Sequence, residues 1–292
     1  MVQKITLTVF TVFLCLSSIS AQELNFGFKA GLNFSTISTD DLEQFDGMEE
    51  YTGNSGFHLG VSVSNKFNDA FGVRAELLFS QKGGRYEYVG ESYTKLISPA
   101  GDSPMESIGE REMSLNVSNA YIDLPIMVYY RPIKWLELAA GFNIAWLASS
   151  TGAGELTFMA EGQAGDEAFR GISLDYSYFR DEVGEADIES TASSANINGS
   201  IWEIPSTIFA YYDYPEGSET RLYNRFDFGL HASTNFYING SLYVGVRFNY
   251  GLTDITNADV DRSLVSTDGG ELILRDDLDR NLSLQASIGF SF

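Results

Sequence analysis

The chain has 292 residues, and its 18 Lys and Arg against 40 Asp and Glu give a formal net charge of −22. Nucleic-acid phosphates require a basic surface, so this acidic balance argues against a nucleic-acid partner. The hydrophobic share of 44% and the charged share of 20% are ordinary globular values and exclude general disorder. No apolar run reaches the roughly 18 residues of a membrane-spanning helix, whereas 28 Gly and 40 aromatic residues favour β-structure.

The first residues have the pattern of a secretory signal peptide. Lys4 precedes an apolar run over 5–16, and the small residues of 17–21 offer a cleavage site before Gln22. We therefore predict a signal peptide over 1–21 and a mature domain over 22–292. The single cysteine, Cys15, lies inside the apolar run, and no small residues precede it as lipid attachment requires.

Beyond Gln22, apolar and polar residues alternate strictly in several segments. In the first, Leu24, Phe26 and Phe28 share one face, whereas Asn25 and Gly27 share the other. This period of two is typical of strands with one apolar face. It predicts eight strands, over 24–34, 57–64, 71–80, 121–131, 136–146, 226–233, 242–251 and 282–290.

Alternation alone does not say which face is buried. In a soluble sandwich or a lipocalin-like barrel the apolar face would point inward. However, short turns near 68–70, 132–134 and 237–240 alternate with long connections, as in outer-membrane barrels with tight periplasmic turns and long extracellular loops. We predict an all-β fold, an eight-stranded antiparallel up-and-down transmembrane β-barrel with both ends at the periplasmic side.

The long connections carry most of the acidic charge. Together 38–54, 91–112, 150–222 and 254–280 hold 33 of the 40 acidic residues but 8 of the 18 basic ones. They are expected to form an acidic extracellular surface. The longest, the insertion 150–222, contains an alternating stretch at 172–179 and an aromatic stretch at 202–214. These stretches either extend the neighbouring hairpin above the membrane or present an exposed aromatic recognition surface, and we favour extension.

Several stretches resemble the PorT-type outer-membrane β-barrel proteins of Bacteroidetes. They are YIDLPIMVYYRP at 121–132, LAAGFNIAWLAS at 138–149, FDFGLHAS at 226–233, YVGVRFNYGLTDI at 243–255 and the terminal SLQASIGFSF. The resemblance implies an eight-stranded barrel of the OmpA or OmpX kind. The best-known member is linked to a secretion system, and no residue here transfers that role.

The polar face carries isolated charges that point into the predicted barrel. They are Lys29, Arg74, Glu76, Lys82, Asp123, Glu137, Asp227 and Arg247. Eight strands leave room only for side chains, and lone buried charges are costly, so these residues should pair and plug the lumen. A gated ion path is the alternative, and we predict no open pore.

Catalysis has little support in the sequence. The two histidines, His58 and His231, fall on predicted strands at roughly opposite sides of the ring, and both are expected to be satisfied interior residues. Ser233 and Asp227 share the face of His231 but need not touch it. We predict no enzyme, no catalytic residues and no cofactor, with a lipid-modifying enzyme as the remote alternative.

Asn257, Asp259, Asp261 and Asp268 form a weak match to a calcium-binding loop. Arg262 stands where such a loop needs glycine, and no glutamate closes it, so we predict no metal-ligating residues. Diffuse bridging by divalent cations between acidic loops and lipopolysaccharide phosphates stays open.

We interpret the protein as a non-enzymatic structural or binding barrel of the outer membrane of a Gram-negative cell. Its expected partners are outer-membrane lipid and lipopolysaccharide, and an extracellular ligand or envelope protein at the loops. Phe292, with Phe290 and Ile288 before it, resembles the C-terminal signal that the outer-membrane assembly machinery reads. The alternative is a membrane subunit of an envelope or secretion complex. We expect a monomer.

Overall fold

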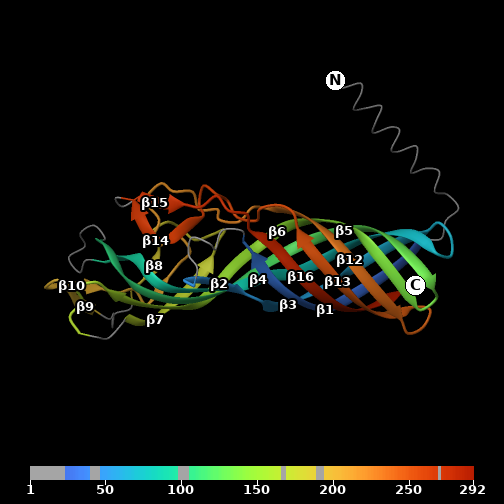
Figure 1. Ribbon diagram of the computed structural model, residues 1–292, viewed down its shortest axis with the longest axis horizontal. Helices are drawn as coiled ribbons and strands as arrows, with labels where there is room; N and C mark the ends of the chain where they lie inside the picture. The colour runs from blue at the N-terminus through green and yellow to red at the C-terminus, as the bar shows by residue number, and fades with distance from the viewer. Residues whose placement is uncertain (1–23, 40–46, 98–104, 166–168, 189–193, 269–270) are drawn as a thin grey trace, which may run out of the picture.

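A computed structural model describes residues 24–39, 47–97, 105–165, 169–188, 194–268 and 271–292. The predicted signal peptide, 1–21, lies outside these residues. Eight strands form one closed antiparallel ring (Figure 1), in the order β1, β3, β4, β5, β6, β12, β13, β16, with β16 pairing back to β1. Their bounds are β1 Leu24–Ser38, β3 Asn54–Lys66, β4 Phe71–Leu96, β5 Met105–Ile133, β6 Leu136–Ala160, β12 Phe226–Tyr237, β13 Leu242–Gly251 and β16 Arg280–Ser291. The predicted eight-stranded barrel is confirmed.

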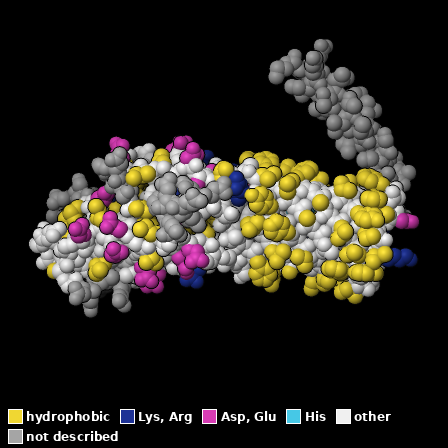
Figure 2. All heavy atoms as spheres, in the orientation of Figure 1, with side chains coloured by type: hydrophobic (Ala, Val, Ile, Leu, Met, Phe, Trp, Pro, Cys, Tyr) yellow, Lys and Arg dark blue, Asp and Glu magenta, His cyan; other side chains and the backbone are white. Residues whose placement is uncertain are grey.

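The ring is apolar on its outside. Along β1, Phe26, Phe28 and Leu32 are exposed whereas Lys29 and Asn33 are buried. Figure 2 shows hydrophobic side chains covering the ring half of the molecule, with acidic side chains gathered on the other half. Closure leaves no unpaired backbone edge, which hydrocarbon would penalise by several kcal/mol per group. In the described part of the chain, no helix is long and apolar enough to span a membrane.

Tight turns close one end of the ring, as the sequence predicts. The Asn68 side chain accepts hydrogen bonds from the amides of Ala70 and Phe71, and Asn239 does the same for Ser241 and Leu242. Such side-chain turns reverse the chain within a few residues. Phe26 and Phe292 exchange two backbone hydrogen bonds at this end, so the first and last strands meet beside the short turns.

At the other end β4, β5 and β6 continue far beyond the ring. They have 26, 29 and 25 residues, whereas a tilted strand crosses a bilayer in about 9–11. Pairing of β4 with β5 persists to Leu96 and Met105. The prediction of a loop over 91–112 is therefore wrong, because most of it is a hairpin that protrudes from the barrel.

Shorter strands complete this protruding part, which we call the crown: the described residues among 47–53, 84–119, 149–223 and 253–279. The strand β2 (Glu49–Thr52) pairs with β4, and β7 (Phe169–Ser177) pairs with β6. The others are β8 Ala186–Asp187 and β11 Thr207–Ile208 beside β7, the hairpin of β9 Ser194–Ile197 and β10 Ser200–Glu203, and the hairpin of β14 Arg262–Asp268 and β15 Glu271–Leu274. The predicted strand at 172–179 is thus confirmed as an extension of the sheet.

The main apolar core lies in the crown, not in the ring. Tyr88, Leu115, Leu156, Phe158 and Tyr211 are members of one large buried cluster. Within the ring, the described buried apolar cluster contains Met127, Tyr129 and Ala139. The molecule therefore combines an inside-out barrel with a crown that is packed like a water-soluble protein.

Candidate functional site

Near the short turns, Glu137 is the centre of a buried ion-pair group. Arg74 donates to both oxygens of Glu137, at 2.7 and 3.0 Å, and Arg131 Nε donates at 2.8 Å. Asn235 and Tyr237 also donate to this carboxylate, at 2.8 and 3.2 Å. The group joins β4, β5, β6 and β12. Arg131 is missing from the predicted interior charges. It lies two residues after Tyr129 on the same strand, so the two side chains share the inner face.

A second group lies around Glu76. Lys29 on β1 and Arg247 on β13 both approach Glu76 on β4, each at 2.9 Å. In the ring order, β13 and β4 are four steps apart in either direction, so Arg247 and Glu76 meet across the barrel.

The remaining predicted interior charges also have partners. Lys82 pairs with Asp123 at 3.0 Å. Asp227 accepts from Thr253 Oγ1 at 3.1 Å and from Asn281 Nδ2 at 2.8 Å. The prediction that the interior charges pair or hydrogen-bond is confirmed for all eight.

The two histidines behave differently. His58 Nδ1 lies 2.7 Å from Asn33 Oδ1, and its Nε2 lies 2.8 Å from Ser287 Oγ, so this histidine is satisfied as expected. No side chain of the described residues bonds the ring nitrogens of His231 or the hydroxyl of Ser233, but the His231 ring has a hydrogen bond with the backbone of Phe142. His231 is thus an interior histidine, as expected, that is held by the backbone and not by side chains as His58 is.

In the crown, Asp213 joins the buried Arg111 and the half-buried Arg262. Its Oδ2 lies 3.2 Å from Arg262 Nη2 and 3.4 Å from Arg111 Nη2. Its Oδ1 accepts from Thr94 Oγ1 and from the Lys95 amide, both at 3.0 Å. Burial by itself raises the pKa of this carboxyl, but the two guanidinium groups outweigh burial and hold the pKa below its ordinary value.

The aromatic stretch 202–214 is mostly buried around Asp213 and its two arginines. Tyr211, Tyr212 and Tyr214 are core residues, and the guanidinium of Arg262 lies 4.5 Å from the centre of the Tyr214 ring. The alternative of an exposed aromatic recognition surface is therefore wrong for these tyrosines. Their hydroxyls donate to backbone carbonyl groups of Tyr178, Lys95 and Val260, which ties the insertion to the rest of the crown.

Where the crown meets the ring, three carboxylates come together. One oxygen from each of Asp261, Asp277 and Asp279 lies within 4.8 Å of the others. Asp277 Oδ2 accepts from Arg275 Nη2 at 2.6 Å and from Thr39 Oγ1 at 2.8 Å. Asp279 Oδ2 accepts from Thr256 Oγ1 at 3.0 Å.

The carboxylates of this group have unusual proton affinities. Burial, together with the charges of Asp279 and Asp277, raises the pKa of Asp261 to about 8 although Arg275 opposes it. Burial and Asp277 raise the pKa of Asp279 to about 6. Burial by itself raises the pKa of Asp277, but the bond from Thr39, the charge of Arg275 and a side-chain hydrogen bond with Asp261 together lower it. Among the residues of the weak calcium-loop match, Asp261 belongs to this group and Asp259 is exposed. The Asp268 side chain lies outside the described part.

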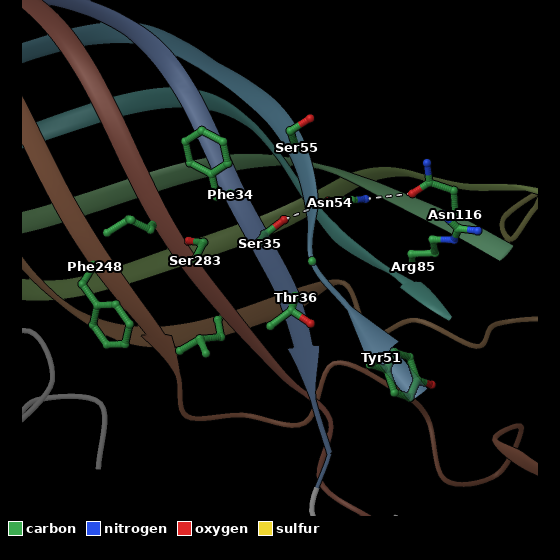
Figure 3. A pocket seen from close by; sticks show the side chains of 13 residues that line it. Phe34, Ser35, Thr36, Tyr51, Asn54, Ser55, Arg85, Asn116, Phe248 and Ser283 are labelled. Atoms are coloured by element: carbon green, nitrogen blue, oxygen red, sulfur yellow. Dashed lines mark hydrogen bonds between the residues drawn. The ribbon is translucent and has the colours of Figure 1, made fainter. Parts of the chain in front are cut away.

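A groove of about 790 Å³ opens on the outside at the same level. Phe34, Phe248 and Leu284 supply its apolar wall, and Arg85 and Asn116 lie on its crown side. Figure 3 shows Asn54 between Ser35 and Asn116, bonded to each at 3.1 Å. The groove therefore spans the border between the apolar band and the polar crown.

Comparison with known families places this chain. A model described as outer membrane protein beta-barrel domain matches residues 20–257. The protein belongs to this family. It is therefore an outer-membrane β-barrel protein, and the exposed apolar side chains of its ring face lipid. The alternative of a soluble barrel with these side chains inside is wrong, because they lie on the outer surface.

Among solved structures, this outer-membrane barrel is similar to Ail, the attachment invasion locus protein of Yersinia pestis. That match has 12% identity, 92% coverage of this chain, 99% coverage of Ail and a TM-score of 0.35. OprG from Pseudomonas aeruginosa matches at 10% identity, with 93% coverage of this chain, 97% coverage of OprG and a TM-score of 0.36. The outer-membrane protease OmpT from Escherichia coli matches at 10% identity, with 93% coverage of this chain, 96% coverage of OmpT and a TM-score of 0.35. No curated protein matches the sequence.

Proposed function

We propose that this protein is a non-enzymatic barrel of the outer membrane whose lumen is plugged and whose crown is its binding surface. The observation that carries the proposal is the contact of Arg247 with Glu76 across the ring, at 2.9 Å. A side chain that reaches the opposite wall supports an obstructed lumen at that level. Lys29 joins the same carboxylate, and the Glu137 group lies between this level and the short turns.

Charge balance supports a permanent plug. A buried ion pair that loses one partner costs about 3–5 kcal/mol, because the remaining charge stays desolvated. Opening a water path through the ring would have to separate several such pairs together. The barrel would then be a rigid anchor for the crown rather than a channel.

The experiment is a planar-bilayer recording on the full mature chain. The wild type is expected to show no stable conductance. Shortening both members of the crossing pair, in E76A together with R247A, is expected to introduce small conductance steps. The matched control is Glu112→Ala, which removes an exposed acid of the crown. A large stable conductance in the wild-type protein would refute the plug.

The crown supports a binding role, because it combines acidic charge with exposed apolar side chains. Val89, Ile108 and Ile201 are exposed on its strands, well away from the lipid band. These features support contact with an extracellular ligand, and the outer groove supports contact with lipopolysaccharide acyl chains at the crown border. We keep the monomer as the expected state.

The same apolar side chains favour the alternative, a PorT-type membrane subunit of an envelope or secretion complex. Co-purification after mild detergent extraction separates the two roles. A stable stoichiometric protein partner supports the subunit, and its absence supports the surface-binding barrel.

Export and insertion complete the proposal. The predicted signal peptide over 1–21 would direct export. The exposed Phe292 and Ile288, on the lipid side of the last strand, would be read by the outer-membrane assembly machinery. Deletion of Phe292 is expected to lower the fraction of protein that reaches the outer membrane.

A further inference from the structure

We propose that Asp261, Asp277 and Asp279 bind one calcium ion at the border between ring and crown. Asp261 directly precedes β14, and Asp277 and Asp279 lie between β15 and β16. The site is distinct from the lumen groups and goes beyond the proposed plug and surface-binding role.

The spacing of the oxygens suits this ion. Calcium binds oxygen at about 2.3–2.6 Å, so two ligands on opposite sides of one ion are at most about 5 Å apart. One oxygen from each of the three carboxylates lies within 4.8 Å of the others, so a single ion can contact all three.

One carboxylate oxygen of the group is left without a donor. Asp279 is 3% exposed, and its Oδ1 is buried without a hydrogen-bond partner, whereas its Oδ2 accepts from Thr256. Asp277 is 6% exposed, its Oδ2 accepts from Arg275 and Thr39, and it shares a side-chain hydrogen bond with Asp261 when Asp261 is protonated. A buried carboxylate oxygen without a donor is costly, so the Oδ1 of Asp279 points to a cation that the protein itself does not supply.

Neighbouring charges leave the group negative. Arg275 faces it, but its guanidinium also binds Glu49, at 3.1 Å, so one positive charge is shared among Glu49 and the three aspartates. Asp254 adds a further acid, which accepts from the backbone amide of Asp279 at 3.2 Å. A divalent cation would balance most of this excess.

The donors select a hard ion. All three ligands are carboxylate oxygens, whereas zinc and other transition metals favour imidazole and thiolate. Calcium takes six to eight oxygens, so carbonyl groups or water would supply the rest, and the expected dissociation constant is about 10⁻⁴–10⁻³ M, as for other extracellular modules. Bound there, the ion would clamp the β14–β15 hairpin to the start of β16 and, through Thr39, to the end of β1.

The test is calorimetric titration of calcium chloride into the full chain folded in detergent micelles, after treatment with a chelator. The wild type is expected to bind one calcium ion per chain. Asp279→Asn is expected to weaken binding at least about 10-fold, since loss of a ligand should cost no less than loss of a supporting contact. Asp259→Asn removes the same charge from an exposed position in the same loop and is expected to leave the affinity unchanged.

Folding of each variant is checked by its heat-modifiable gel mobility. Asp261→Asn is a second ligand variant, at a half-buried position, in case Asp279→Asn does not fold. The proposal is overturned if the folded wild type shows no saturable binding up to about 10 mM calcium. It is also overturned if both ligand variants bind as tightly as the wild type, because the calcium would then be held diffusely by the acidic surface. Magnesium in place of calcium should bind more weakly, and equal or tighter binding overturns the choice of ion.

Discussion

The same three strands, β4, β5 and β6, run through the ring and the crown but bury opposite kinds of side chain. On β5, Asp123 points into the ring, whereas Leu115 and Met113 point into the crown core. In the ring the outer face contacts lipid and must be apolar, so the interior is left to polar groups. In the crown water surrounds the outer face, and the apolar side chains turn inward. The surrounding solvent, not the strand geometry, decides which face is apolar.

The two regions also treat charge differently. The ring balances its buried charges internally, with each carboxylate bonded to a base or to amide and hydroxyl donors. The Asp261 group at the crown border has more acids than Arg275 can neutralise, and the Oδ1 of Asp279 has no donor. This contrast suggests that the ring is complete without ions, whereas the crown depends on protons or a cation from outside.

The largest expected effect lies in the ring. Glu137→Ala leaves Arg74 and Arg131 buried without their carboxylate. Removing one partner of such a group costs about 3–5 kcal/mol, which denaturant unfolding in lipid vesicles measures. The control is Glu87→Ala, which breaks the exposed pair with Arg85 in the crown and should cost less than about 1 kcal/mol. Equal losses in the two variants would contradict the assigned difference between the regions.

A change in the crown core comes next. Leu156 is 1% exposed, so Leu156→Ala should leave a cavity and cost about 2–5 kcal/mol of crown stability. Protease digestion should then cut the crown faster while the heat-modifiable mobility of the ring is kept. Leu230, 52% exposed on the lipid face, is the control, and Leu230→Ala should leave digestion of the crown unchanged. Loss of the ring in the Leu156 variant would show that the two regions unfold as one unit.

The smallest effect concerns acid. The pKa of Asp213 is lowered in the folded crown, so its ionised carboxylate stabilises the fold. This stabilisation is fully present at pH values above the pKa of Asp in the unfolded chain, about 4. That contribution is lost as pH falls through the folded value, because the protonated acid no longer pairs with Arg262 and Arg111. Tyrosine and tryptophan fluorescence should therefore report crown opening below about pH 4, with no change from this group between pH 7 and 5.

Asp213→Asn provides the matched comparison. It should open the crown more readily at pH 7 and show a weaker acid dependence than the wild type. The same acid midpoint in both proteins would mean that other carboxyls govern the transition.

Much of the ring could be predicted because strand alternation is a local property. Each predicted strand in the ring appears in the structure, and so do the short turns. The strands of the crown were harder to predict from the sequence. On 84–96 and 105–119 the apolar side chains change from the outer to the inner face, so a single apolar face does not run along the whole strand. The sequence left open whether the aromatic stretch with Tyr211 and Tyr214 is exposed, and its burial results from packing against the β4–β5 hairpin and Arg262.

The sequence by itself determined the eight strands of the ring and the placement of acids in the long connections, since both follow from residues that are neighbours along the chain. The alternation of short turns with long connections indicated which face of these strands meets lipid. Only the tertiary structure decided which charges meet. Arg247 reaches Glu76 because ring closure sets β13 opposite β4, and Asp261 meets Asp277 and Asp279 because the pairing of β14 with β15 brings the two ends of that hairpin together. Such contacts depend on closure and register, which couple residues far apart in sequence and leave no periodic signal in it.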